Sequence, residues 1–228
     1  MTGFGSVIVD GDRWDDRGAV VDVENDPRQP AVVVTSGTRL GQRQSIESRT
    51  EGHADRIRIE PLLIGRVESL SLGLGSPTII RIAGQEVRIN FDPNRGPVTF
   101  FDSFAQLAAL IPNGINGSMT EVHGTLVWDA RAARHVIEAS RIEKLAALPA
   151  GLMRVTGIVS DRTADGFRLG DLLVRVPSSA LVVPANRAIA NGQPVTVWGR
   201  ALAATPSPPL PADANRIRVL DGQPPGAS

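Results

Sequence analysis

The chain has 228 residues, of which 42% are hydrophobic and 21% charged, values typical of a folded globular protein. Its 24 Lys and Arg residues balance its 24 Asp and Glu residues, so no overall field attracts nucleic acid or an anionic membrane surface. The sequence contains no cysteine, which excludes disulfides, zinc–thiolate sites and cysteine nucleophiles.

The most informative feature is a strand pattern, Ala-x-Arg-Ile, that occurs three times, at residues 54–57, 139–142 and 214–217. A turn glycine and an alternating segment precede each copy, starting at Gly41, Gly117 and Gly192. Alternation of this kind marks a half-buried strand. Each copy also begins with Gly-x-Val, at Gly5, Gly65 and Gly157, and an expected hairpin follows at residues 80–89 and 167–176; residues 19–23 are a poorer copy of its first strand.

The repeat predicts an all-β protein of three tandem five-stranded units. A unit of this length closes economically into a small barrel, because closure removes unpaired strand edges, and Gly124 and Gly199 suit its corners. We expect three OB-like barrels and a flexible tail, at residues 1–60, 61–145, 146–221 and 222–228, with the first barrel the least complete. One helix, at about 102–111, is expected in the second unit, where Asp102 is a suitable N-cap and Pro112 ends the pattern.

The alternation also assigns faces to the closing strand of each unit. Ala and Arg of Ala-x-Arg-Ile are two positions apart and share one face, whereas Ile lies on the other. We therefore expect the isoleucines inside the barrels, at Ile57, Ile142 and Ile217. The arginines are expected outside, each paired with a carboxylate or capping a strand carbonyl, at Arg56, Arg141 and Arg216.

Motifs that carry chemistry are scarce, and we expect neither catalytic residues, nor a metal, nor a cofactor. The carboxylate cluster at 10–16 lacks the Gly and Glu that a calcium loop needs and is typical of an Asp-Gly hairpin turn. The three histidines have no ligand-like spacing, although His123 and His135 would approach each other if their two strands paired in that way. The Gly-rich segment 71–76 is not followed by a P-loop lysine, and the Pro-rich segment 205–211 is interpreted as a stiff loop rather than a polyproline ligand.

Charge is distributed unevenly along the chain. Residues 1–60 carry a net charge of −3, residues 61–145 are neutral and residues 146–228 carry +3. A candidate surface for a ligand or partner therefore lies in the third unit, at Arg154, Arg168, Arg175, Arg200 and Trp198. Single-stranded nucleic acid is the alternative ligand of such a barrel, but it needs exposed aromatic rings, and this unit has only Phe167 and Trp198. A protein or glycan partner is the preferred interpretation.

The pattern Gly-x-Val, hairpin, Leu-x-x-Gly-Gln-x-hydrophobic-x-hydrophobic-x-Gly and Ala-x-Arg-Ile resembles the bacterial "domain of unknown function 5666" family. The resemblance covers nearly the whole chain and depends on turn glycines and alternation rather than on a chemical motif. The start, Thr2 to Gly11, also resembles mature members just after a secretory or lipoprotein leader. The first unit departs from the pattern, with Ser48 in place of the corner glycine and Gln44 in place of a core aliphatic residue.

The resemblance implies an exported protein of the periplasm or outer envelope, with no established activity. The sequence given has no signal-peptide pattern and no membrane span, and a cytoplasmic location is the alternative. We therefore expect a non-catalytic scaffold or binding module for a protein or glycan. The alternatives are an OB-type nucleic-acid binder that uses the third unit and a hydrolase without a recognisable motif.

Overall fold

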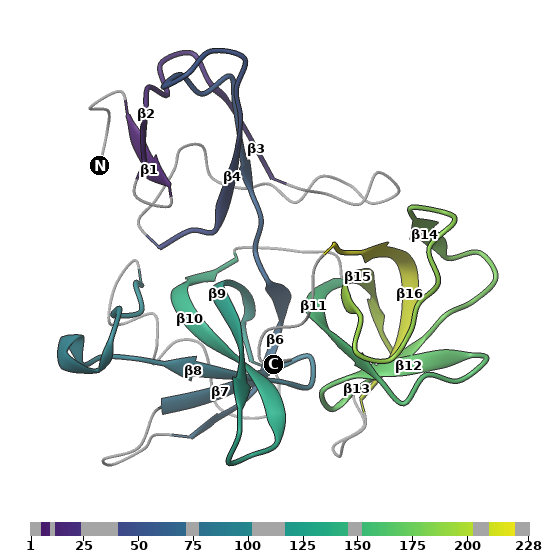
Figure 1. Ribbon diagram of the computed structural model, residues 1–228. Helices are drawn as coiled ribbons and strands as arrows, with labels where there is room; N and C mark the ends of the chain where they lie inside the picture. The colour runs from purple at the N-terminus through teal and green to yellow at the C-terminus, as the bar shows by residue number, and fades with distance from the viewer. Residues whose placement is uncertain are drawn as a thin grey trace. The chain divides into compact units, whose positions relative to one another are not determined.

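A computed structural model describes residues 6–9, 12–23, 41–71, 78–101, 117–145, 152–202 and 210–221. These residues form sixteen strands and one short 3-10 helix, η1 (Pro93–Arg95), so the predicted all-β class is confirmed (Figure 1). The helix expected at 102–111, the tail at 222–228 and most of the Pro-rich segment lie outside the described residues. No helix in the described ranges is long and apolar enough to cross a membrane.

The chain divides into two compact units, Met1–Pro61 and Leu62–Ser228. In the first unit, β1 (Val7–Val9) and β2 (Asp12–Trp14) are paired antiparallel; the Asp-Gly turn expected between them, at residues 10 and 11, lies outside the described residues. A second sheet of this unit has the order β3–β5–β4, with β3 and β5 parallel and β4 and β5 antiparallel. Its strands are β3 (Val20–Val23), β4 (Gln44–Glu47) and β5 (Arg56–Ile59).

The second unit contains the second and third sequence repeats in one eleven-stranded sheet. The second repeat contributes β6 (Leu63–Ser71), β7 (Thr78–Ile82), β8 (Gln85–Ile89), β9 (Met119–Asp129) and β10 (Arg134–Lys144). Their pairings run β6–β7–β8–β10–β9 and return to β6, so the five strands form a closed circuit. Only β8 and β10 are parallel.

The third repeat forms an equivalent circuit. It contributes β11 (Leu152–Ser160), β12 (Gly166–Leu169), β13 (Leu172–Arg175), β15 (Pro194–Ala201) and β16 (Leu210–Val219), paired in the order β11–β12–β13–β16–β15 and back to β11. The parallel pair is again formed by the third and fifth strands of the circuit, here β13 and β16. One further strand, β14 (Leu181–Val183), pairs with β16.

The repeats agree in register as well as in strand order. The fourth and fifth strands of the three repeats pair through Ile46 with Ile57, Val122 with Ile142 and Val197 with Ile217. In the second and third repeats the register then shifts by one residue, at Ser140 and Asn215, beside the corner glycines. Residues that align in the three copies of the sequence therefore occupy equivalent positions in the pairing.

Repeats two and three also pair with each other. Leu63 and Val155 occupy equivalent positions in the two repeats, and they are cross-strand partners where β6 meets β11. The hairpin turns meet in the same manner, since the Asp171 N–H donates to the carbonyl of its equivalent, Gly84, over 3.0 Å. Equivalent residues contact each other only at a two-fold axis. The two repeats are thus related by an approximate two-fold axis, which makes them halves of one unit.

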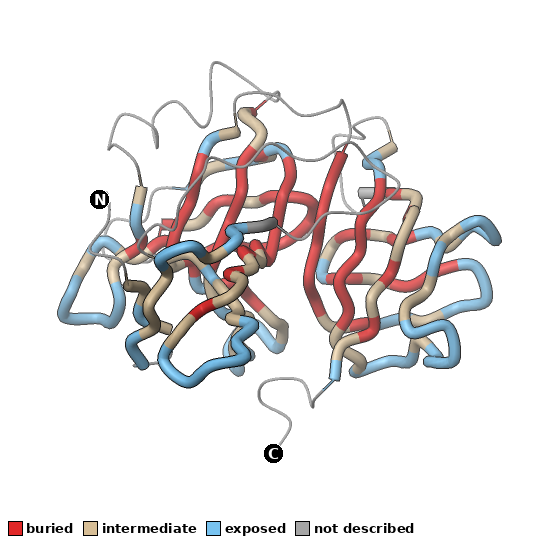
Figure 2. Tube along the Cα trace, turned by 90° about the horizontal axis from the view of Figure 1, so that it is seen from above, coloured by how far each residue is buried: buried red, intermediate tan, exposed pale blue. Residues whose placement is uncertain are grey.

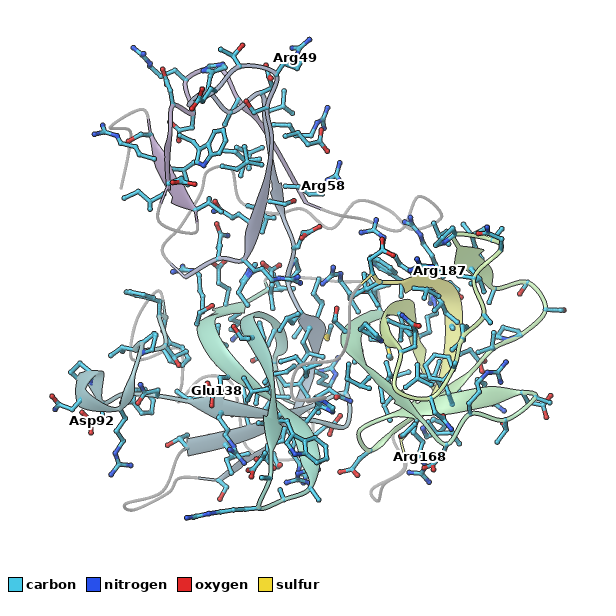
Figure 3. The ribbon with its side chains drawn as sticks, viewed as in Figure 1. Arg49, Arg58, Asp92, Glu138, Arg168 and Arg187 are labelled. Atoms are coloured by element: carbon cyan, nitrogen blue, oxygen red, sulfur yellow. The ribbon has the colours of Figure 1, made fainter. Side chains whose placement is uncertain are left out.

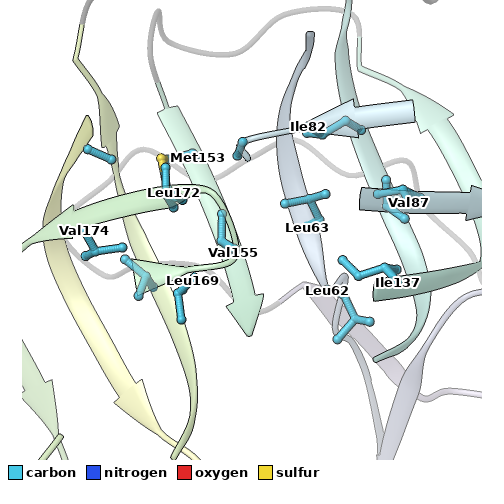
Figure 4. Packing of buried hydrophobic residues seen from close by; sticks show 14 of the residues in the cluster. Leu62, Leu63, Ile82, Val87, Ile137, Met153, Val155, Leu169, Leu172 and Val174 are labelled. Carbon is cyan, nitrogen blue, oxygen red and sulfur yellow. The ribbon is translucent and has the colours of Figure 1, made fainter. Parts of the chain in front are cut away.

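The hydrophobic core fills both circuits. Leu63 and Val155 lie on the adjacent strands that join them (Figure 4), and buried segments follow the middles of the strands, with exposed residues mainly in turns (Figure 2). The three repeat isoleucines, Ile57, Ile142 and Ile217, are all buried, which confirms the face predicted for them.

Ile142→Ala is expected to destabilise the second unit by about 2–5 kcal/mol, because it removes buried methylene groups and leaves a cavity. The side chain is only 1% exposed and belongs to the core cluster. Urea denaturation measures the change. Leu181→Ala, at an exposed position of the same unit, is the control and should change stability by about 0.5 kcal/mol or less.

Candidate functional site

A row of side chains crosses six strands of the second unit on the face opposite the core. Its members are cross-strand partners from one strand to the next: Glu143 on β10, Glu121 on β9, Ile64 on β6, Arg154 on β11, Trp198 on β15 and Arg216 on β16. Directly paired residues place their side chains on the same side of a sheet. Together with the residues two positions along the same strands, His123, Arg141, Thr156, Thr196 and Arg218, this row defines what we call the shared face.

The half of the shared face that belongs to repeat two contains both signs of charge. His123 Nε2 lies 2.6 Å from Glu121 Oε1, and both side chains are almost completely buried. Arg141 hydrogen-bonds Glu143 through its Nε. A buried charge is tolerated when it is paired and hydrogen-bonded. This half is therefore a set of buried polar side chains that hydrogen-bond one another.

Arg141 corrects one expectation from the sequence. It lies on the outer face, as predicted, but it is only 5% exposed and is therefore not on the solvent-accessible surface. Alternation decides which side of a strand a residue faces, and it carries no information about what covers that side. Its equivalent Arg56 matches the expectation, since its side chain is 40% exposed and lies 3.6 Å from Glu47. The expected carboxylate partners of Arg56 and Arg141 are confirmed.

The half that belongs to repeat three is centred on Trp198. The guanidinium carbons of Arg154, Arg216 and Arg218 lie 5.2, 5.0 and 5.7 Å from the centre of its ring. Distances of about 6 Å or less are those of cation–π contacts. Trp198 itself is 4% exposed, and the adjacent hydroxyls of Thr156 and Thr196 are 2.9 Å apart. Burial lowers the pKa of the Arg218 guanidinium.

The structure brings together only two of the five site residues predicted from the sequence, Arg154 and Trp198. Arg175 binds Asp213 over 2.9 Å, and Arg200 is the cross-strand partner of that same aspartate, so these two arginines flank a carboxylate instead. Arg168, on β12 (Figure 3), lies 3.5 Å from Asp161, which follows the end of β11. Both residues of this pair lie outside the shared face.

Sequence reasoning left Arg216 and Arg218 out of the predicted site. The signal for them was present in the repeat, since the alignment that places His123 opposite Arg141 also places Trp198 opposite Arg216. The expected approach of His123 to His135 is wrong, because β9 and β10 pair in a register that sets His135 against Trp128, with ring centres 5.0 Å apart. The described residues hold no cluster of three or more His, Asp or Glu suited to a metal ion.

A second charged cluster joins β8 to the β9–β10 hairpin. Glu86 is buried and contacts both Arg88 and Arg134, while Arg88 also hydrogen-bonds Asp129. The Arg88 hydrogen bond, assisted by the backbone N–H groups of Ala132 and Arg131, lowers the pKa of Asp129 to about 2. Because these contacts hold the hairpin against β8, the cluster is structural.

This cluster predicts a component of acid denaturation. A carboxylate whose pKa is lower in the folded state than in the unfolded state stabilises the fold above its unfolded pKa, and that contribution is lost as pH falls. For Asp129 the loss runs from about pH 4 down to about pH 2. Urea denaturation between these values should show a shallower pH dependence for Asp129→Asn than for the wild type. Asp165→Asn, at an exposed aspartate, controls for net charge.

No protein-family model matches the chain, and neither the curated proteins nor the solved structures include a match to it.

Proposed function

We propose that the protein is a non-catalytic binding module of the bacterial envelope, in which two OB-like barrels present one face to a protein or glycan partner. The closed circuits support the barrel assignment, because their order of first, second, third, fifth and fourth strand, with a parallel third–fifth pair, is that of an OB fold. The order β3–β5–β4 and the Ile46–Ile57 register support a third, less complete copy in the first unit.

The observation that carries the binding function is the shared face. Outward-facing side chains of a strand are ordinarily solvated, and buried charges lower stability unless they are well paired. Here Glu121, Glu143, Arg141 and Arg154 are buried on the face opposite the core, and the same face continues across both repeats. These charged side chains lie outside the core cluster, where filling of the barrel interiors does not require them, and they therefore support a role in recognition.

A nucleic-acid function of the third unit is less well supported. Base stacking needs accessible rings. Phe167 is fully buried in the core, and Trp198 is buried beneath arginine side chains. Fluorescence anisotropy with a labelled oligonucleotide at low salt tests this alternative; binding that weakens steeply with salt would support it. Panels of ester, phosphate and glycoside substrates test the hydrolase alternative, and turnover would overturn the non-catalytic assignment.

Location in the envelope, and membership of the "domain of unknown function 5666" family, are part of this proposal and follow from the resemblance described above. Fractionation of cells that express the native gene tests them. Recovery of the protein in periplasmic or outer-membrane fractions is the expected result, and recovery in the cytoplasm alone would contradict the envelope assignment.

The binding function itself is tested by capture from an envelope extract with three immobilised proteins: wild type, Arg218→Glu and Arg168→Glu. Arg218 lies on the shared face, whereas Arg168 lies on the β12–β13 hairpin, and both substitutions reverse one charge at a half-exposed position. A protein or glycan retained by the wild type and by Arg168→Glu, and lost with Arg218→Glu, is the expected result. Retention that Arg168→Glu impairs equally, or no retention, would contradict the proposal.

A further inference from the structure

The segment that follows β8, residues 90–101, is a compact loop closed by its own hydrogen bonds. Asn90 Nδ2 donates to the carbonyls of Gly96 and Pro97, over 3.0 Å each, and the N–H of Thr99 donates to the Asn90 carbonyl over 2.8 Å. The Thr99 hydroxyl donates in turn to a backbone carbonyl of β10. The loop is therefore held in one shape before a ligand binds, which reduces the conformational entropy that binding would cost.

Two phenylalanine rings of this loop are exposed, Phe91 at 44% and Phe100 at 41%. Phe101 packs against the core cluster and stacks on Phe91, with ring centres 6.1 Å apart and an angle of 18° between the rings. Phe100 forms a β-bridge with Arg141, so its side chain lies on the same side of the strands, at the margin of the shared face. The core thus supports one exposed ring, and the other continues the shared face to an accessible edge.

These two rings stand out among the exposed apolar side chains. Four large apolar side chains are exposed in the described part of the second unit, and this loop holds two of them, both aromatic. Asn94 and Arg95 are exposed between the rings, so the rings do not form the contiguous apolar patch that a lipid surface or the centre of a protein interface needs. Aromatic rings beside a few polar groups are typical of a site for a ligand that stacks and hydrogen-bonds.

The charge of the loop distinguishes two ligands that stack on aromatic rings, nucleic-acid bases and sugars. Binding of single-stranded nucleic acid combines rings with a positively charged groove along the phosphates. The loop contains one acidic and one basic side chain, Asp92 and Arg95, which lie 3.4 Å apart, so its net charge is zero. A neutral sugar needs no such groove, because the C–H groups of its ring contact the negative face of an aromatic ring.

The polar side chains of the loop suit sugar hydroxyls. Asp92 lies beyond the end of β8 (Figure 3), where its carboxylate accepts hydrogen bonds from the backbone and side-chain N–H groups of Asn94. The Asp92 and Arg95 side chains are 45% and 63% exposed, so hydroxyl groups can reach both. A carboxylate accepts hydrogen bonds from hydroxyls, and a guanidinium donates to them.

We propose that the 90–101 loop is a carbohydrate-binding element, in which Phe91 and Phe100 stack against rings of a neutral oligosaccharide and the polar side chains between them hydrogen-bond its hydroxyls. This inference rests on the proposed binding function, and it selects a glycan rather than a protein as the partner. Phe101 and the hydrogen bonds of Asn90 hold the rings in position, and Phe100 connects the loop to the shared face.

The phenylalanines provide a direct probe of this site. The chain contains six of them, so protein labelled with 4-fluorophenylalanine gives ¹⁹F signals that substitution of each residue assigns. Cellotetraose, chitotetraose and maltotetraose are titrated separately. The expected result is a saturable shift of the Phe91 and Phe100 signals, with a Kd of about 1 mM or lower for at least one sugar. The signal of Phe167, which is fully buried in repeat three, should stay unchanged.

Variants test whether these rings are responsible. Phe91→Leu and Phe100→Leu each keep an apolar side chain but remove the aromatic face, and each should weaken binding of the tightest sugar by about fivefold or more. Trp128→Leu removes a ring of similar exposure, 45%, beside His135 at the start of β10, and should change the affinity by about twofold or less. Urea denaturation shows that the three variants are folded under the conditions of the titration.

Three results would overturn the inference. These are the lack of a saturable shift with any of the three sugars, a loss of affinity with Trp128→Leu equal to that with the phenylalanine variants, and a shift of the Phe91 and Phe100 signals by a poly(dT) oligonucleotide but by none of the sugars. The last result would assign the rings to base stacking instead.

The outcome is separable from that of the proposed function. A protein partner whose capture depends on Arg218, in a chain that binds none of the three sugars, would overturn the carbohydrate site and leave the binding module intact. Saturable sugar binding at Phe91 and Phe100, without any captured partner, would retain the carbohydrate site and contradict recognition by the shared face.

Discussion

Arg141→Ala is expected to destabilise the second unit by about 3–5 kcal/mol, the range for removal of one partner from a buried ion pair. Arg141 and Glu143 are both almost fully buried and hydrogen-bonded to each other. Loss of the guanidinium leaves the Glu143 carboxylate without that partner in a site that water does not readily reach. Urea denaturation of the wild type and the variant measures the difference.

The control is Arg175→Ala in the same unit. Arg175 also donates to a carboxylate, that of Asp213, but its side chain is 55% exposed. An exposed pair of this kind contributes about 0–1 kcal/mol. A further variant, Arg141→Met with Glu143→Leu, removes both buried charges and should recover most of the lost stability. If Arg141→Ala lowers the stability no more than Arg175→Ala does, the Arg141–Glu143 pair is not buried in the way that the structure indicates.

Gly84→Ala is the second substitution expected to have a large effect, about 2–5 kcal/mol. Gly84 has φ +69°, a left-handed conformation that costs a residue with a Cβ about 1–2 kcal/mol. An added Cβ would also lie 2.6 Å from Leu172 N and 2.8 Å from Asp171 C, in the backbone of the other repeat. Overpacking against groups that cannot rotate away adds about 1–3 kcal/mol. Thermal or urea denaturation measures the sum.

Gly192→Ala separates the two contributions. Gly192 has φ +81°, and no atom lies within 4 Å of the position of an added Cβ. Its substitution therefore costs only the conformational part, about 1–2 kcal/mol. Equal losses of stability for Gly84→Ala and Gly192→Ala would mean that the hairpin turns of repeats two and three do not contact each other.

Much of the fold could be predicted because the chain contains the same strand pattern three times. Alignment of the copies predicted which strands are equivalent, which isoleucines are buried and where the corner glycines lie, and each of these features is present in the second and third repeats. These features depend on local alternation and on turn residues, which a sequence displays directly.

The pairing of repeat two with repeat three could not be predicted in the same way. It depends on a short contact between β6 and β11, around Leu63 and Val155, and on the meeting of two hairpin turns. Leu63 and Val155 resemble any other core residues of a strand, so nothing in the alternation indicates that the circuits share a core. The two-fold axis follows only from the equivalence of residues that touch.

The candidate site was predicted only in part, because composition does not show which side chains lie together in the fold. Composition pointed to the basic third repeat, and Arg154 and Trp198 do lie together. Arg168, Arg175 and Arg200 belong to the same repeat but lie beside aspartates and not around Trp198. Net charge along the sequence does not show which arginines converge on one ring; cross-strand register does.

Because the shared face is built from both repeats, it exists only if repeats two and three fold together. The most direct test is a urea titration of the protein labelled with 5-fluorotryptophan, with the ¹⁹F signals of Trp128 in repeat two and Trp198 in repeat three followed separately. A single cooperative unit requires the two folded signals to disappear over the same range of urea concentration. Loss of one signal at a distinctly lower concentration than the other would show two independent domains and would contradict the shared face.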